Sequence, residues 1–147
     1  MPTVTRTVHT PAPIDVVQRY LRDFTNAEEW DAGTISCTPV DDTPVGVGKQ
    51  WENVSEFQGR ETTLTYTLER DEPDHLRIVG RNKTVTSEDD MDLTASEDGG
   101  TDVSYTATFT FHGAAKLATP LLVPALGKLA DDAEKSLHDA LQDLPVS

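Results

Sequence analysis

Alternating apolar and polar residues recur in six successive segments between residues 34 and 111, with turn residues between them. A period of two is typical of strands that bury one face. The cleanest alternation places these residues on one side: Val103, Tyr105, Ala107, Phe109 and Phe111. Because short turns such as Glu97–Gly100 join antiparallel neighbours, the pattern predicts an antiparallel meander with one apolar face.

A single long helical pattern follows the strands, from Ala114 to Leu144. Its apolar residues fall near one stripe: Leu117, Leu121, Leu122, Leu126, Leu129, Ala133, Leu137, Leu141 and Leu144. Pro120 and Pro124 each remove a backbone donor, so we expect a break or kink there and regular helix from Pro120 or later. The apolar face of the sheet is the available partner for this stripe.

The N-terminal part predicts a strand over residues 3–9 and a helix opened by Pro13. A second short helix is expected over Ala27–Trp30, capped by Thr25 or Asn26. The fold class is therefore α+β, with a curved seven-stranded antiparallel sheet, two short helices after the first strand and a long C-terminal helix. With 147 residues and no linker, residues 1–147 are expected to form a single domain.

The net charge of −14, from 26 acidic residues against 12 Lys and Arg, disfavours nucleic acid and anionic lipid surfaces. A single cysteine, Cys37, excludes an intramolecular disulfide and favours a reducing compartment. No signal-peptide pattern and no apolar run of membrane-spanning length occur. We therefore expect a cytoplasmic monomer or homodimer with no integral membrane contact. The four histidines have no ligand spacing and no nucleotide motif occurs, so neither metal nor cofactor is expected.

Four stretches resemble the SRPBCC superfamily, the START and pollen-allergen-like helix-grip group, and within it the polyketide cyclase/dehydrase-like branch. They are Pro11–Val17, Phe24–Asp31, Gly46–Trp51 and Gly99–Tyr105. With the matching element order, the resemblance covers essentially the whole chain. It implies a hydrophobic cavity between the sheet and the last helix, entered near the start of that helix. Members bind lipids, sterols, hormones or polyketides, and some cyclise or dehydrate a polyketide.

Strand parity and helix position then predict which residues would contact a small apolar ligand. They are Trp30, Trp51, Asn53, Ser55, Leu64, Tyr66, Ile78, Met91, Tyr105, Phe109, Leu121 and Leu122. For the two tryptophans the alternative is packing in the core or rim. For the two tyrosines it is a hydroxyl bonded to backbone or water.

No residue is assigned a catalytic role, but four are candidates for a cyclase reaction. Tyr66 and Tyr105 could polarise a carbonyl, Arg60 could hold an enolate, and His112 could transfer protons. A surface position is the alternative for Arg60 and His112. The acidic run Glu88–Asp92 is interpreted as a solvated face, because Glu88, Asp90 and Asp92 alternate with Met91 and Leu93.

Three functions remain open from the sequence. The favoured one is binding of a small hydrophobic or amphipathic ligand, such as a lipid or polyketide, without catalysis. The alternatives are a cyclase/dehydratase-type enzyme and a protein-interaction or chaperone-cofactor module.

Overall fold

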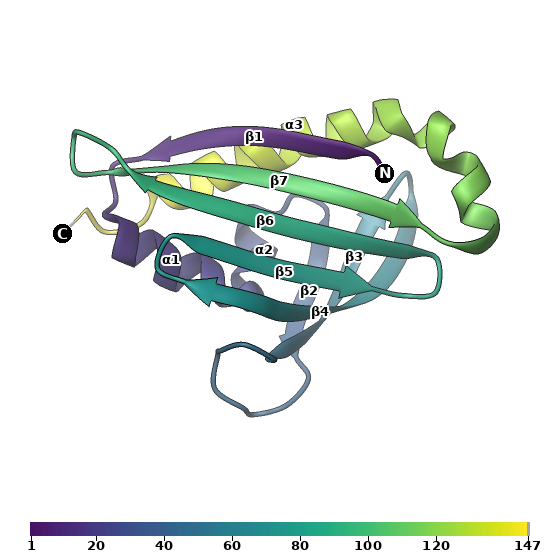
Figure 1. Ribbon diagram of the computed structural model, residues 1–147, viewed down its shortest axis with the longest axis horizontal. Coiled ribbons are helices and arrows are strands. Elements are labelled where there is room, and N and C mark those ends of the chain that lie inside the picture. Colours follow the sequence, from purple (N-terminus) through teal and green to yellow (C-terminus); the bar gives the residue numbers. More distant parts are fainter. Residues whose placement is uncertain (147) are drawn as a thin grey trace.

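The computed structural model describes residues 1–146 and confirms the predicted α+β arrangement (Figure 1). Its elements are β1 (Thr3–Thr10), α1 (Ile14–Arg22), the 3-10 helix η1 (Phe24–Asn26), α2 (Ala27–Trp30), β2 (Thr34–Pro39), β3 (Gln50–Phe57), β4 (Arg60–Glu72), β5 (His75–Arg81), β6 (Val85–Ala95), β7 (Thr101–Phe111), the 3-10 helix η2 (Gly113–Ala118) and α3 (Thr119–Gln142). None of the helices in residues 1–146 is both long and apolar enough to cross a membrane.

The strands form one seven-stranded antiparallel sheet in the order β1-β7-β6-β5-β4-β3-β2. The register shifts between Thr34 and Ser36 in β2 and between Leu68 and Arg70 in β4. Such irregularities bend a strand and increase its twist. The sheet therefore curves, and α3 lies behind it across the concave face in Figure 1.

The C-terminal part of α3 is fixed to β1 by side-chain contacts. The buried Thr10 hydroxyl donates to the carbonyl of Leu141 at 2.9 Å, and Arg6 pairs with Asp131 at 2.8 Å. The helix also packs against α2. These contacts hold the second half of α3 against the edge of the sheet that β1 forms.

The N-terminal part of α3 differs from the sequence prediction. The helix begins at Thr119 and continues through Pro124, and its first buried residue is Leu126. Leu117 and Leu121 are 85% and 82% exposed, so placing them on the buried stripe was wrong. Successive helical residues are about 100° apart, so Leu122 faces the sheet while Leu121 turns outward.

The predicted cap of α2 is confirmed in position and corrected in detail. Asn26 is the N-cap residue, but its side chain makes no capping hydrogen bond. Asp23 instead caps η1 by accepting from the Thr25 amide at 3.1 Å, because η1 runs directly into α2. The Thr25 hydroxyl is free to accept from the indole nitrogen of Trp51 at 3.1 Å.

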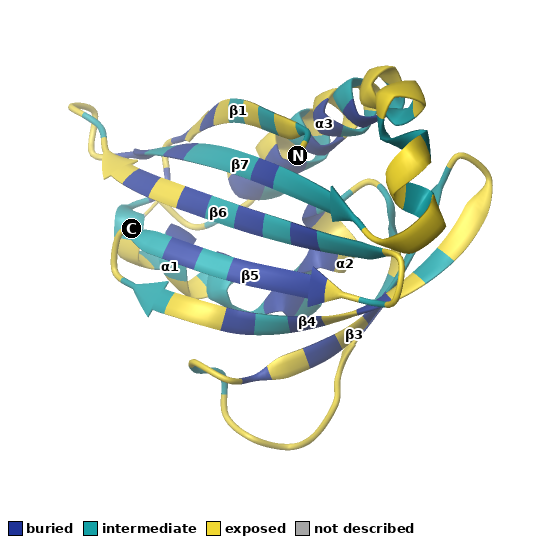
Figure 2. Cartoon of the chain, turned by 45° about the vertical axis from the view of Figure 1, so that its right-hand side comes forward, coloured by how far each residue is buried: buried dark blue, intermediate teal, exposed yellow. Residues whose placement is uncertain are grey.

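One half of the interior, next to α1 and α2, is filled by large buried side chains, and we call it the packed half. It contains Leu21, Phe24, Trp30, Trp51, Leu68, Leu76, Ile78, Met91, Val103, Leu137 and Leu141. The Phe24 ring lies at its centre, 6.0 Å from Trp30 and 6.1 Å from Trp51 between ring centroids. Figure 2 shows buried positions alternating with more exposed ones along the strands, as the period of two predicts.

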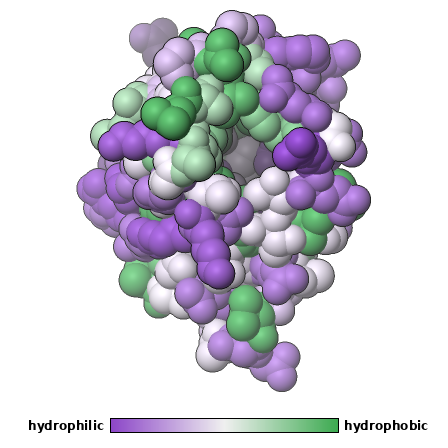
Figure 3. Space-filling view, turned by 90° about the vertical axis from the view of Figure 1, so that its right-hand side faces the viewer, coloured by the Kyte–Doolittle hydropathy of each residue, from purple (hydrophilic) through white to green (hydrophobic). Residues whose placement is uncertain are grey.

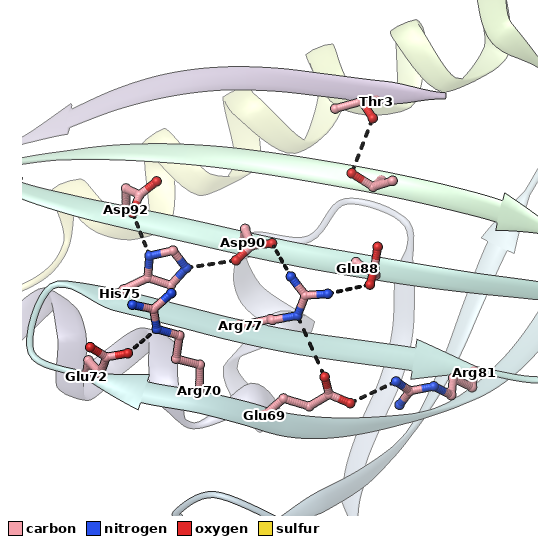
Figure 4. Close-up of polar contacts among 11 residues, drawn as sticks. Thr3, Glu69, Arg70, Glu72, His75, Arg77, Arg81, Glu88, Asp90 and Asp92 are labelled. Atoms are coloured by element: carbon pink, nitrogen blue, oxygen red, sulfur yellow. Dashed lines mark hydrogen bonds and ion pairs between the residues drawn. The ribbon is translucent and has the colours of Figure 1, made fainter. Parts of the chain in front are cut away.

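The outer face of the sheet carries charged side chains from β4, β5 and β6 (Figure 4). Arg77 pairs with Glu88 at 2.5 Å and with Asp90 at 3.0 Å. His75 contacts Asp90 and Asp92 at 2.8 and 2.7 Å. The prediction that Glu88, Asp90 and Asp92 lie opposite the apolar face is confirmed, although most of these acids pair with cations.

Candidate functional site

A cavity of about 250 Å³ lies between the inner face of the sheet and α3, beyond the packed half. We call this part of the interior the hollow half. Figure 3, which faces the end of the molecule that carries η2, shows a hollow with hydrophobic residues gathered beside it. The start of α3 and η2 thus border its mouth.

Most of the cavity wall is apolar. Residues at helical spacing on α3 form one side: Leu122, Leu126, Leu129, Ala130 and Ala133. Alternate residues of β7 form another: Tyr105, Ala107, Phe109 and Phe111. The face of β7 predicted to be apolar is therefore the face that lines the cavity.

Tyr66 marks the boundary between the two halves. Its ring is 4.5 Å from the Phe24 ring between centroids, and it also lines the cavity. It pairs in register with Gly80, where a Cβ atom would come within 2.5 Å of the Tyr66 ring. A glycine on β5 thus lets the ring lie across the sheet. Burial, and next the charge of Asp89, raise the pKa of this phenol well above its usual value.

Asp89 is the most buried acid of the cavity, at 4% exposure. It accepts a hydrogen bond from the Tyr105 hydroxyl at 3.1 Å. Burial chiefly, and then the charge of Asp31, raise its pKa to about 8. The carboxyl is therefore largely protonated at neutral pH while the cavity holds no compensating charge.

Asp31, which directly follows α2, is a second carboxyl of the cavity. Burial raises its pKa, although it accepts from the Thr34 hydroxyl at 2.8 Å and from the Gly33 amide at 3.3 Å. Asn53 donates to the Thr34 hydroxyl at 3.1 Å and accepts from Ser55 at 2.5 Å. This chain of hydrogen bonds holds Asp31 in place.

Six of the residues predicted to contact a ligand line the cavity together. They are Ser55, Leu64, Tyr66, Tyr105, Phe109 and Leu122. Five others are buried but do not line it: Trp30, Trp51, Asn53, Ile78 and Met91. Parity assigned the four strand residues among them to the buried face, but these residues lie in the packed half or, for Asn53, bond to Ser55 without reaching the cavity. Leu121 is turned to solvent, as described above.

Two of the four catalytic candidates lie outside the cavity. Arg60 is exposed at the start of β4, away from the lining. His112 is exposed and its Nε2 lies 2.8 Å from the Thr86 hydroxyl, so it contacts the outer part of β6 instead. The structure brings only Tyr66 and Tyr105 to the cavity, where Asp89 joins them.

Sequence reasoning missed Asp89 because it treated the acidic run of β6 as one solvated face. The signal was present, since Asp89 shares the parity of Met91 and Leu93, both buried. An acid on the buried face of a strand is uncommon and therefore informative. Asp31 gave no comparable signal, because it follows a single helical turn and its direction is set by the loop.

Comparison with known proteins supports the fold. A START superfamily protein from Mycobacterium smegmatis superimposes with a TM-score of 0.78 at 13% identity, covering 96% of this chain and 97% of that one. The Zhui aromatase/cyclase from a Streptomyces species gives 0.77 at 15% identity, covering 95% and 92%. A Thermus thermophilus protein gives 0.68 at 20% identity, covering 95% and 99%.

At these identities the similarity concerns the fold alone. No curated protein matches the chain in sequence. The sequence profile of the family described as polyketide cyclase / dehydrase and lipid transport, in contrast, matches residues 1–142. Because this match covers nearly the whole chain, the chain belongs to the polyketide cyclase / dehydrase and lipid transport family.

Proposed function

We propose that this protein binds a small hydrophobic or amphipathic molecule, such as a lipid or a polyketide, in the cavity between the sheet and α3. The observation that carries the proposal is the cavity of about 250 Å³, whose walls are mostly apolar. Its closed end, the end next to the packed half, carries polar groups from Tyr66, Asp89 and Tyr105. Ligand sites in proteins commonly combine these two features. An apolar space of this size would otherwise forfeit packing contacts.

A neutral hydrophobic dye such as Nile red tests this function by titration, with native mass spectrometry of the gently purified protein to detect a retained molecule. Ala130→Phe places a ring in the cavity from the buried face of α3. Ala114→Phe makes the same change at an exposed position of η2. We expect Ala130→Phe to weaken dye binding about tenfold or more and Ala114→Phe to change it less than about twofold. Equal binding by all three proteins would contradict the proposal.

A cyclase/dehydratase reaction is the second candidate, and the Tyr105–Asp89 contact favours it. A phenol and a carboxyl of raised pKa at the closed end could exchange protons with a substrate carbonyl. Incubation with a linear poly-β-ketone thioester, followed by product analysis, tests this reaction. Tyr105→Phe should slow it by about a hundredfold. A rate no greater than in buffer would eliminate the enzyme hypothesis.

The interaction-module hypothesis stays a prediction. Leu117, Leu121 and Val123 are exposed at 85, 82 and 51%, all near the start of α3. Their position beside the mouth of the cavity is equally suited to guiding an apolar ligand inward.

A further inference from the structure

The closed end of the cavity contains a buried carboxyl with an unused acceptor. Asp89 is 4% exposed, and its Oδ1 atom accepts from Tyr105. Within residues 1–146, its Oδ2 atom receives no hydrogen bond from a side chain and is not sealed from solvent, so it is open to the cavity. A carboxylate in apolar surroundings is costly unless donors or an opposite charge compensate it. A ligand that brings a hydrogen-bond donor to Oδ2 would supply the partner that no side chain of the protein provides.

The charges of the lining indicate which sign that ligand carries. Three acidic residues line the cavity, Asp31, Glu56 and Asp89, whereas its described lining includes no Lys, Arg or His. Lys128 lines an adjoining groove but pairs with Asp132 at 2.8 Å. An anionic headgroup would meet like charge, and a neutral one would leave Asp89 protonated without an ionic partner, whereas a cation could pair with the ionised carboxyl.

We propose that the cavity selects hydrophobic primary amines, with the ammonium group bound by Asp89 and Asp31 and the hydrocarbon part against α3. The inference rests on the proposed function, because it specifies the ligand class of the same cavity. An ammonium has three donors, enough for both carboxyls and for one hydroxyl of the closed end. Leu122, Leu126 and Ala130 present the apolar surface for the hydrocarbon part.

Amine binding is then coupled to the release of a proton from Asp89. The ionisable groups that face it or share its cavity are Asp31 after α2, Glu56 of β3, Tyr66 of β4, Tyr105 of β7 and Asp90 on its own strand. The α3 side of the cavity contributes only apolar residues. With its pKa near 8, Asp89 loses its proton as the pH rises past that value, while an alkylamine stays protonated to about pH 10.4, as Lys does. Affinity for the amine should therefore rise between about pH 6 and about pH 9.

Three probes that share one alkyl chain test the selection by isothermal titration calorimetry on the full chain: octylamine, octanol and octanoate. At about pH 8.5 we expect octylamine to bind about tenfold more tightly than octanol, and octanoate to bind most weakly. Asp89→Asn should bring octylamine down to the affinity of octanol. Glu97→Gln removes one charge from an exposed hairpin and should leave the preference intact, which separates the site from the acidic surface.

Each outcome separates the two proposals. If none of the probes binds, the proposed binding function fails. If octanol or octanoate binds as tightly as octylamine, or if Glu97→Gln abolishes the preference as fully as Asp89→Asn, only the amine selection is overturned. The wild-type protein provides a second test that needs no variant. Octylamine affinity should rise about tenfold from about pH 6 to about pH 9 while octanol affinity stays constant, and a flat profile for octylamine would overturn the inference.

Discussion

The packed and hollow halves of the interior are built from the same strands, and they differ in what faces those strands. On β3, Trp51 belongs to the packed half and Ser55 lines the cavity, although both point to the same side. On β6, Met91 and Ser87 show the same division. The cavity is therefore not a separate structural element, and a single sheet face serves both as core and as cavity wall.

Two features across from the sheet create the difference. In the packed half, Phe24 enters from the segment between α1 and α2, and α3 contributes Leu137 and Leu141. In the hollow half, α3 contributes the small residues Ala130 and Ala133, beside three leucines nearer its start, Leu122, Leu126 and Leu129. A leucine side chain is larger than that of alanine by three carbon atoms, so the two alanines leave room where the helix passes from the packed half to the hollow half.

The largest expected effect compares a phenylalanine from each half. Phe24→Ala should lower the free energy of unfolding by about 3–5 kcal/mol, because it removes a fully buried ring among three aromatic neighbours. Phe109→Ala should cost about 1 kcal/mol, since that ring is only partly buried beside the cavity. Urea denaturation measures both, and similar losses would erase the distinction between the halves.

The next effect concerns the polar end of the hollow half. Asp89 has a pKa raised above its unfolded value. Between about pH 4 and about pH 8 the native state therefore holds a proton that the unfolded chain has already released. This residue therefore lowers stability progressively as the pH rises through that range. Asp89→Asn should raise the free energy of unfolding by about 2–4 kcal/mol at about pH 9 and change it little at about pH 4. Unfolding curves at both pH values give the comparison, and a gain that does not depend on pH would refute the explanation.

A smaller effect is expected at the boundary between the halves. Gly80→Ala places a Cβ within 2.5 Å of the Tyr66 ring, which must move. We expect a loss of about 1–3 kcal/mol in unfolding free energy, together with a change in ligand binding. Gly46→Ala is the control, because no atom lies within 4 Å of the Cβ position there. Equal thermal shifts for the two variants would mean that the ring does not depend on Gly80.

The smallest effect is expected on the outer face, whose ion pairs contact neither half. Arg77→Met should cost about 0.5–1 kcal/mol, less at high salt, because the guanidinium is partly exposed and its pairs are screened. Arg19→Met removes a cation that is 73% exposed and 4.0 Å from Asp15, and should change stability hardly at all. Urea denaturation at two salt concentrations measures both variants. A loss above about 3 kcal/mol for Arg77→Met would show that the ion pairs of the outer face stabilise the protein as much as a buried ring of the packed half.

Periodicity in the sequence was sufficient for the fold and for the side to which each strand residue points. It could not separate Trp51 from Ser55, because two residues of the same parity on one strand give the same signal. The separation depends on Phe24, which contacts strands far away in sequence. Leu121 was misplaced for a different reason, since Leu122 is the residue of that helical turn that faces the cavity, and Leu121, about 100° away around the helix, turns outward. Asp89 could have been found by applying parity to the acidic run as strictly as to the apolar residues.

The contact between Trp30 and Tyr105 has a practical consequence for optical measurements. Neither tryptophan lines the cavity, yet the Trp30 ring meets that of Tyr105 edge to face at 5.8 Å, and Tyr105 does line it. The Trp30 indole nitrogen is buried without a hydrogen-bond partner among the described residues, so its emission should respond to small shifts of neighbouring dipoles. In a Trp51→Phe background, Trp30 is the single tryptophan, and the Tyr105 ring separates it from the cavity. Occupancy of the cavity could then be followed in the unlabelled protein through the wavelength of its own emission.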